Sequence, residues 1–147
     1  MQVCDQTMTT KRLRTRRSTC PTCHALDIFG DKWTLLIVRD LMFKGKSRFG
    51  EFLDSEEGIA TNILAERLNR LEDCELVERR PDPTNTRASV FVLTRKGREL
   101  LPLMIEITMW SAKYNRGCEA PAVLMRRYKS DRASLLRDLM TSLEQAA

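Results

Sequence analysis

Two cysteines and a histidine near the start of the chain have a spacing that suits thiol chemistry, Cys20-Pro-Thr-Cys23-His24. A thiol at the N-terminus of a helix is acidified, because the helix dipole stabilises the thiolate. Cys20 is therefore a candidate sensor of oxidants or electrophiles, with Cys23 as a candidate resolving partner. A zinc site built from Cys4, Cys20, Cys23 and His24 is a second interpretation, and a small packed thiol is a third. A long basic segment separates Cys4 from Cys20, so we expect no metal and no cofactor.

A second group of residues has the types and spacing needed to read DNA. Residues 61–73 repeat leucine at positions 64, 68 and 71, which places Leu64, Leu68 and Leu71 on one face of a helix. The opposite face is rich in hydrogen-bond donors and suits a DNA major groove. Its candidate DNA contacts are Thr61, Asn62, Glu66, Arg67 and Arg70. For Arg67, an ion pair with an acid on the core side is an equal alternative.

A basic two-stranded ribbon is predicted after this helix. Residues 76–80 and 88–93 are typical of strands, and Pro81 and Pro83 are expected to end the first strand and make residues 81–87 the turn. The candidate DNA contacts here are Arg79, Arg80, Asn85 and Arg87, together with Arg48 before the preceding helix. A helix followed by such a ribbon predicts an α+β, mostly α, winged helix-turn-helix with flanking dimerisation helices.

The remaining segments are predicted to support this unit. Residues 1–19 form a flexible basic tail that is either a mobile arm or a DNA-touching arm. Residues 20–114 form the winged helix-turn-helix domain with a long dimerisation helix, and residues 115–147 form a helical extension. The long helix is apolar on more than one side, which predicts a homodimer. On it, Met104, Met109 and Trp110 would line either the dimer core or a pocket for a small-molecule inducer.

The bulk composition fits a DNA-binding globular domain. The 147 residues are 42% hydrophobic and 31% charged, with a net charge of +5, which suits a polyanionic partner. There is no run of about 18 apolar residues and no apolar signal core, so we expect a cytoplasmic protein without a membrane segment. The odd number of cysteines, five, argues against a disulfide framework.

The order of these motifs resembles that of the HxlR-type bacterial regulators, relatives of the MarR winged-helix proteins. The resemblance covers residues 20–114 and is carried by five segments in addition to Cys20-Pro21, namely 25–37, 48–52, 58–68, 76–79 and 93–97. It implies a dimeric transcription factor that reads a palindromic operator. It also implies that the first helix and the long helix after the ribbon build the dimer, and that Cys20 matches a sensing cysteine of some members.

Two positions depart from the family pattern. Glu75 stands where a glycine is common, and in a left-handed conformation it would cost about 1 kcal/mol. Ala60 stands where a serine often caps the helix, so Thr61 is expected to take over the cap.

We therefore predict a repressor, not an enzyme, that binds double-stranded DNA and responds to thiol oxidation, electrophiles or a small ligand. A winged helix that docks on protein is one alternative, and a thiol oxidoreductase using Cys20 and Cys23 is another. The arginines at positions 79, 80 and 87 favour DNA over protein. No second catalytic constellation accompanies the cysteine pair, which argues against the oxidoreductase.

Overall fold

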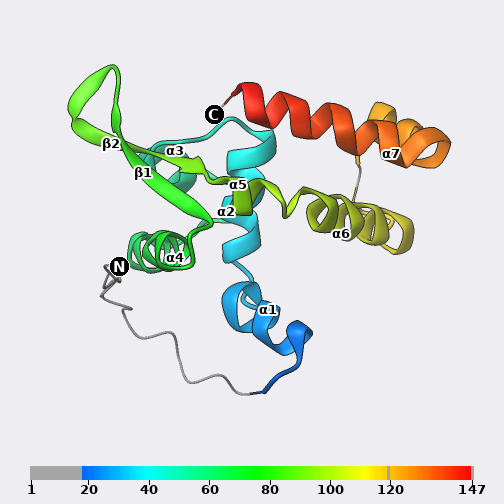
Figure 1. The fold of residues 1–147 in the computed structure, drawn as a ribbon, viewed down its shortest axis with the longest axis horizontal. Helices are drawn as coiled ribbons and strands as arrows, with labels where there is room; N and C mark the ends of the chain where they lie inside the picture. The colour runs from blue at the N-terminus through cyan, green and yellow to red at the C-terminus, as the bar shows by residue number, and fades with distance from the viewer. Residues whose placement is uncertain (1–17, 119, 147) are drawn as a thin grey trace, which may run out of the picture.

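The helices surround a core to which one small antiparallel hairpin is attached (Figure 1). A computed structural model describes residues 18–118 and 120–146. In chain order the elements are α1 (Pro21–Phe29), α2 (Thr34–Phe43), α3 (Phe49–Leu53), α4 (Thr61–Asp73), β1 (Val77–Asp82), β2 (Asn85–Leu93), α5 (Arg95–Arg98), α6 (Leu101–Tyr114) and α7 (Ala122–Gln145). The predicted tail lies almost wholly outside the described residues, as does Cys4.

The leucine face of α4 is buried, as its spacing predicts. Leu64, Leu68 and Leu71 are at most 1% exposed and belong to the same core as Val38 of α2 and Phe52 of α3. Burying a leucine side chain contributes roughly 1.5–3 kcal/mol, so this face fixes which side of α4 turns outward. The helix, its neighbours α2 and α3 and the hairpin form the predicted winged helix-turn-helix.

Local signals set the ends of α2. The Asp31 carboxylate accepts hydrogen bonds from the backbone N–H groups of Trp33 (2.8 Å) and Thr34 (3.0 Å), which satisfies two donors at the helix start. Gly45 follows the helix with φ +63°, a conformation that glycine adopts without steric cost.

The predicted turn of the hairpin is wrong in extent. Strand β1 runs through Pro81 to Asp82, and β2 already begins at Asn85, so only Pro83 and Thr84 connect them. A two-stranded ribbon leaves one edge of each strand unpaired, where a missing N–H removes no ladder bond, so a proline fits inside it. The register runs from the Val77–Leu93 pair to the Pro81–Ser89 pair and shifts between Pro81 and Asp82.

Two expectations about caps and turns have different outcomes. Glu75 has φ 59°, so the left-handed conformation is kept without glycine. The N-cap of α4 is Ala60, which makes no side-chain cap, and Thr61 is already the first helical residue, so the expected shift of the cap is wrong. The Thr94 hydroxyl accepts a hydrogen bond from the Gly97 N–H (3.1 Å) and so caps the short helix α5.

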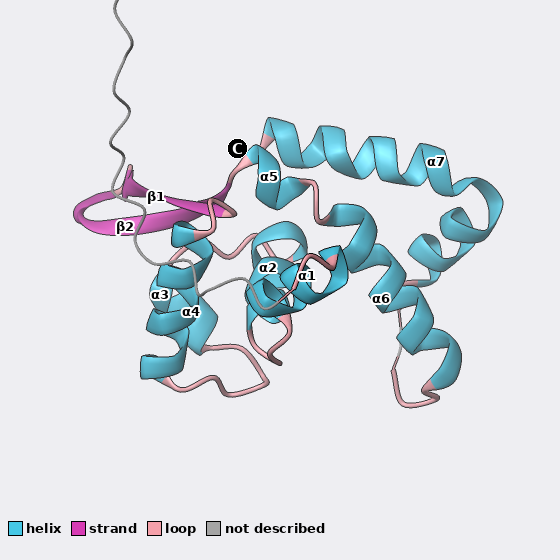
Figure 2. Ribbon diagram, turned by 60° about the horizontal axis from the view of Figure 1, so that its bottom comes forward, coloured by secondary structure: helices cyan, strands magenta, loops and turns pink. Residues whose placement is uncertain are grey.

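The C-terminal helix α7 lies beside α6, as both views show (Figures 1 and 2). It is kinked at Asp131, whose backbone is non-helical (φ −154°, ψ 83°), and Leu135 is buried against the rest of the molecule. Glu106 of α6 accepts hydrogen bonds from the Tyr128 hydroxyl (2.8 Å) and from Arg132 Nε (2.6 Å). Among the described residues, no helix combines the length and apolarity needed to span a membrane.

Candidate nucleic-acid interface

The outward face of α4 presents polar side chains at its N-terminal end. Thr61 and Asn62 are exposed, and the Glu66 side chain is 64% exposed. Arg70 is half-buried further along the helix. The N-terminal residues of a recognition helix are the ones that reach base edges, so Thr61 and Asn62 stay the candidates for base contacts.

Arg67 lies near two acids, Glu66 on this outward face (3.6 Å) and Asp31. Its side chain is only 18% exposed, and its Nε lies 3.3 Å from Asp31 Oδ1 at the start of α2. Burial raises the pKa of Asp31, but hydrogen bonds from Thr34 and Trp33 and the charge of Arg67 outweigh it and lower the pKa. The geometry matches the alternative in which Arg67 pairs with an acid inside the protein.

The hairpin carries its candidate contacts in two groups. Asn85 and Arg87 are exposed next to the turn, where the Arg87 N–H donates to Asn85 Oδ1 (3.1 Å). Nearer the base, Arg79 donates to Glu72 of α4 (2.9 Å), and its guanidinium lies 5.0 Å from the centre of the Phe91 ring. Arg80 pairs with Glu78 on the same strand. The structure therefore ties Arg79 to α4 and leaves Arg87 extended at the tip.

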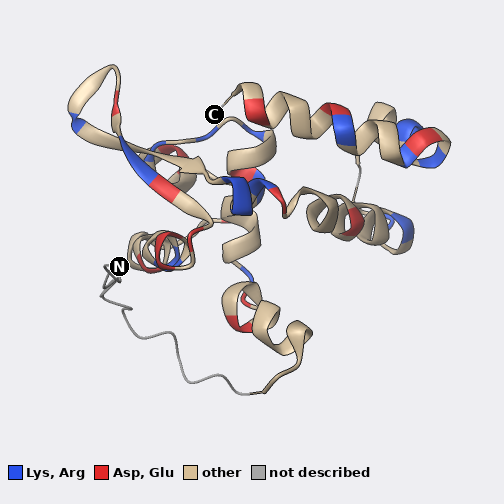
Figure 3. Cartoon of the chain, viewed as in Figure 1, with Lys and Arg blue, Asp and Glu red and all other residues tan. Residues whose placement is uncertain are grey.

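Charged side chains lie on both the hairpin and α4. Figure 3 shows basic and acidic positions on both the hairpin and α4, and basic positions on α5. The backbone between the hairpin and α4 is short, and the two elements lie side by side. A duplex that meets the polar face of α4 would therefore also meet the arginines of the hairpin.

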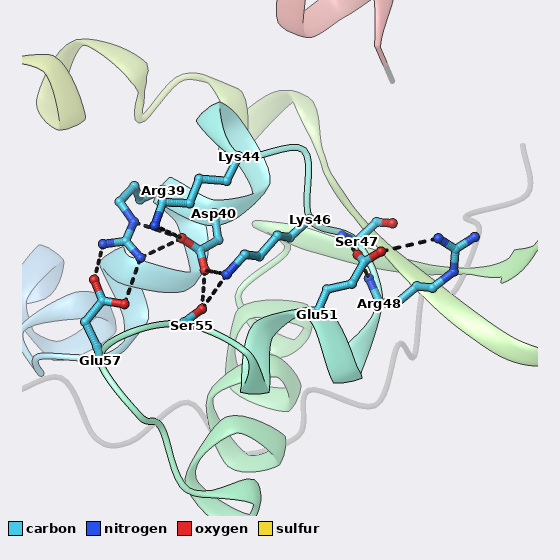
Figure 4. Close-up of polar contacts among 9 residues, drawn as sticks. All are labelled: Arg39, Asp40, Lys44, Lys46, Ser47, Arg48, Glu51, Ser55 and Glu57. Atoms are coloured by element: carbon cyan, nitrogen blue, oxygen red, sulfur yellow. Dashed lines mark hydrogen bonds and ion pairs between the residues drawn. The ribbon is translucent and has the colours of Figure 1, made fainter. Parts of the chain in front are cut away.

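A buried aspartate that the sequence did not reveal holds the corner between α2 and α4. Asp40 Oδ2 accepts hydrogen bonds from Lys46 Nζ (2.9 Å) and Ser55 Oγ (2.7 Å), and Asp40 Oδ1 accepts from Arg39 Nε (2.8 Å). Arg39 in turn binds Glu57 (3.2 Å), as Figure 4 shows. These contacts tie the segment between α3 and α4 to α2, so they set the position of α4.

The same contacts shift the acidity of both carboxylates. Burial raises the pKa of Asp40, but the hydrogen bonds from Ser55, Lys46 and Arg39 together lower it. The Arg39 hydrogen bond lowers the pKa of Glu57 to about 2. Both groups therefore stay ionised at neutral pH and keep the corner closed.

Glu51, a residue of α3, accepts hydrogen bonds from backbone N–H groups at the N-terminus of that helix. Glu51 Oε2 accepts hydrogen bonds from the backbone N–H groups of Ser47 (2.7 Å) and Arg48 (2.8 Å), which lowers the pKa of Glu51 (Figure 4). Arg48 itself is the N-cap residue of α3, and its guanidinium is directed to the hairpin residue Asp82.

The predicted thiol site lies at the start of α1. Cys20 is the exposed N-cap residue of α1, and hydrogen bonds from the backbone of Cys23 and of Thr22 lower the pKa of its thiol. Cys23 is half-buried one turn later. Burial raises the pKa of the Cys74 thiol instead, so Cys74 is the less reactive type.

The described residues contain no group of three or more potential metal ligands. Cys4, the fourth ligand of the zinc interpretation, lies outside them.

The three candidate pocket residues of α6 lie in different environments. Met104 is 6% exposed and belongs to the core, Met109 is half-buried, and Trp110 is 67% exposed. None of the three lines the cavities that Phe52, Leu143 and Arg79 border, and their role in binding a small molecule stays a prediction. The more prominent feature of α6 is a stripe of exposed apolar side chains at helical spacing, Leu103, Ile107, Trp110 and Tyr114.

Comparison with known proteins agrees with this architecture. The HxlR-like helix-turn-helix family matches residues 28–118, which leaves α7 outside the match. An uncharacterized HTH-type transcriptional regulator of Synechocystis, sll1512, is 37% identical over 86 residues, which are 58% of this chain and 63% of that protein. The chain thus spans slightly less than two thirds of that relative. The HTH-type transcriptional regulator YodB of Bacillus subtilis is 34% identical over 96 residues, 65% of this chain and 85% of YodB.

Solved structures agree as well. Reduced YodB aligns with a TM-score of 0.55 at 33% identity, covering 69% of this chain and all of that one (100%). The redox regulator HypR in its oxidized form aligns with a TM-score of 0.58 at 29% identity, covering 65% of this chain and 98% of that one.

Proposed function

The chain belongs to the HxlR-like helix-turn-helix family, and we propose that it is a transcriptional repressor that binds a palindromic operator as a homodimer. One observation carries the proposal. The polar N-terminal end of α4 is exposed, the leucine face of α4 is buried, and α4 contacts β1 of a hairpin that has an exposed arginine next to its turn. In this arrangement α4 enters the major groove, and Arg87 reaches phosphates or the adjacent minor groove.

A second copy of the chain is the partner that the α6 stripe favours. Ile107 is 42% exposed, Trp110 67% and Tyr114 65%, and their spacing places them on one face with Leu103. Helix α1 has no buried residue, and its Leu26 is 55% exposed. Exposed apolar patches of this kind mark protein contacts. A two-fold contact through α6 and α1 would present two α4 helices to half-sites roughly 34 Å apart.

Cys20 is the proposed point at which a signal enters. Its lowered thiol pKa and its exposure favour reaction with oxidants and electrophiles. The similar protein YodB has been solved in quinone-bound and diamide-treated forms, and HypR in oxidized and reduced forms. With diamide, two thiols of this chain would give two electrons and two protons to the N=N bond, forming a disulfide and a hydrazine. Cys20 and Cys23 are the proposed pair.

The test is fluorescence anisotropy with labelled DNA from upstream of the protein's own gene and with scrambled DNA, across a salt series. We expect tight binding to the upstream DNA only, and affinity that falls steeply with salt as counterions are released. Diamide should weaken the binding of the wild-type protein to the upstream DNA and should leave the binding of Cys20→Ser unchanged. Equal, weak and salt-independent binding to both DNAs would overturn the proposal in favour of a winged helix that docks on protein.

A further inference from the structure

We propose that Arg48 is a wing-positioning residue: its guanidinium clamps the turn of the β1–β2 hairpin to the N-terminus of α3. The clamp would hold the hairpin at the angle at which Arg87 meets DNA. This inference rests on the proposed DNA binding. It gives Arg48 a different role from the phosphate contact that the sequence suggested.

The contact between Arg48 and the hairpin is bidentate. Arg48 Nε donates to Asp82 Oδ2 (2.6 Å), and Nη2 donates to Asp82 Oδ1 (3.1 Å) and to Thr84 Oγ1 (3.2 Å). A paired fork of this kind fixes the direction of the side chain as well as its distance. The guanidinium is thereby aimed at the hairpin and has few donors left for a phosphate.

Asp82 is built into the hairpin as an anchor. Its side chain is only 1% exposed, and Oδ1 also accepts hydrogen bonds from the backbone N–H (2.8 Å) and the hydroxyl (2.8 Å) of Thr84. It is the last residue of β1, directly after the register shift. Hydrogen bonds from Arg48 and then from Thr84 hold the pKa of Asp82 well below its ordinary value, so the carboxylate stays charged.

A second attachment lies nearer the base of the hairpin. The Phe91 N–H donates to the Ser47 carbonyl (2.7 Å), and Arg48 forms an isolated antiparallel bridge with Val90. The backbone of residues 47–48 therefore holds the body of β2, and the Arg48 side chain holds the turn. The Arg79–Glu72 bond also lies near the base, so these contacts fix the base of the ribbon and the Arg48 side chain holds its far end.

The substitution Asp82→Asn distinguishes two roles of Arg48, positioning the hairpin and contacting DNA directly, because the two roles predict opposite changes in DNA affinity. If Arg48 bound a phosphate, Asp82→Asn would strengthen DNA binding, because a carboxylate near the phosphates is removed and Arg48 keeps only Glu51 (3.3 Å) as an acidic partner. If Arg48 positions the hairpin, the same change weakens binding although the protein becomes more positive. A purely electrostatic account cannot produce this second result.

The experiment measures operator affinity and its salt dependence for wild type, Asp82→Asn, Arg48→Lys and Arg87→Ala. We expect Asp82→Asn and Arg48→Lys each to weaken specific binding roughly tenfold, the size of one lost arginine contact. The salt slope should fall by about one as the Arg87 phosphate contact is lost. Adding Arg87→Ala to Asp82→Asn should then weaken binding less than twofold, since the tip is already misplaced.

Glu99→Gln is the matched control, because it also removes a carboxylate paired with an arginine, in the exposed Arg95–Glu99 pair. It should leave operator affinity within twofold of wild type. Hydrogen exchange of the hairpin, measured without DNA, should be faster in Asp82→Asn and Arg48→Lys than in Glu99→Gln. That measurement also shows whether the rest of each variant stays folded.

The outcomes separate this inference from the proposed function. If wild type binds no DNA specifically, the proposed function fails. If wild type binds its operator and Asp82→Asn binds as tightly or more tightly, the positioning role is wrong and Arg48 contacts DNA directly. Additive effects of Asp82→Asn and Arg87→Ala with unchanged hairpin exchange would also overturn it.

Discussion

The side of the molecule that carries α4 and the hairpin differs from the side that carries α6 in how its side chains find partners. On the side of α4 and the hairpin, charged groups find partners within the chain, as Asp40 does with Lys46 and Ser55. On the side of α6, apolar side chains such as Trp110 are left exposed. Figure 1 places the hairpin and α6 on opposite sides of α2. The geometry of α4 and the hairpin is thus set within one chain, whereas the α6 face is the one proposed to contact a second copy.

The largest expected effect comes from breaking the α6 face. Ile107→Glu places a charge at the centre of the proposed contact, where burial would cost several kcal/mol per subunit, so the protein should become monomeric at micromolar concentration. Operator affinity should fall at least about a hundredfold, because a monomer can no longer bind both half-sites of the operator at once. Sedimentation velocity and anisotropy measure the two results.

Lys113→Gln is the control for this change, since it alters the net charge equally on the same helix. It should stay dimeric and bind normally. In Ile107→Glu, α4 and the hairpin should stay folded, so their hydrogen exchange should be as slow as in wild type. A dimer that persists in Ile107→Glu would remove α6 from the interface.

The reverse experiment breaks the α4 side. Asp40→Asn leaves Lys46 without its countercharge and leaves Arg39 paired with Glu57 alone, and we expect a loss of about 3 kcal/mol in the free energy of unfolding. Urea unfolding at pH 7 measures it. Asp138→Asn, in the exposed Arg127–Asp138 pair, should change stability by less than about 0.5 kcal/mol. Dimerisation of folded Asp40→Asn should be unchanged, and a loss of the dimer would contradict the separation of the two sides.

The same cluster predicts the direction of the pH dependence. The pKa values of Asp40 and Glu57 are lower in the folded protein than in ordinary solution, that of Glu57 at about 2. Their stabilisation is therefore fully present above the unfolded values of roughly 4 and is lost as the pH falls toward 2. Asp40→Asn should show a shallower loss of stability over this range than wild type.

Local patterns predicted the parts of the site that one segment determines. The bounds of α4, residues 61–73, follow from leucine spacing, and the acidified Cys20 follows from its place before a helix. The clamp between Arg48 and Asp82 joins residues 34 positions apart, and the Asp40–Ser55 bond joins residues 15 apart. No periodicity or motif links such partners, because only the packing of α2, α3 and the hairpin brings them together.

The smallest expected effect concerns the turn that joins α4 to β1. Glu75 has φ 59°, in a region where glycine has no steric cost, so Glu75→Gly should stabilise the protein by about 0.5–1 kcal/mol. The gain is limited because glycine also makes the unfolded chain more flexible. Glu75→Ala keeps the Cβ atom and should give no gain, and urea unfolding compares the three proteins. Because the strain lies within one chain, the gain should be equal in the Ile107→Glu background, and a gain only in the dimer would place this turn under the control of the partner subunit.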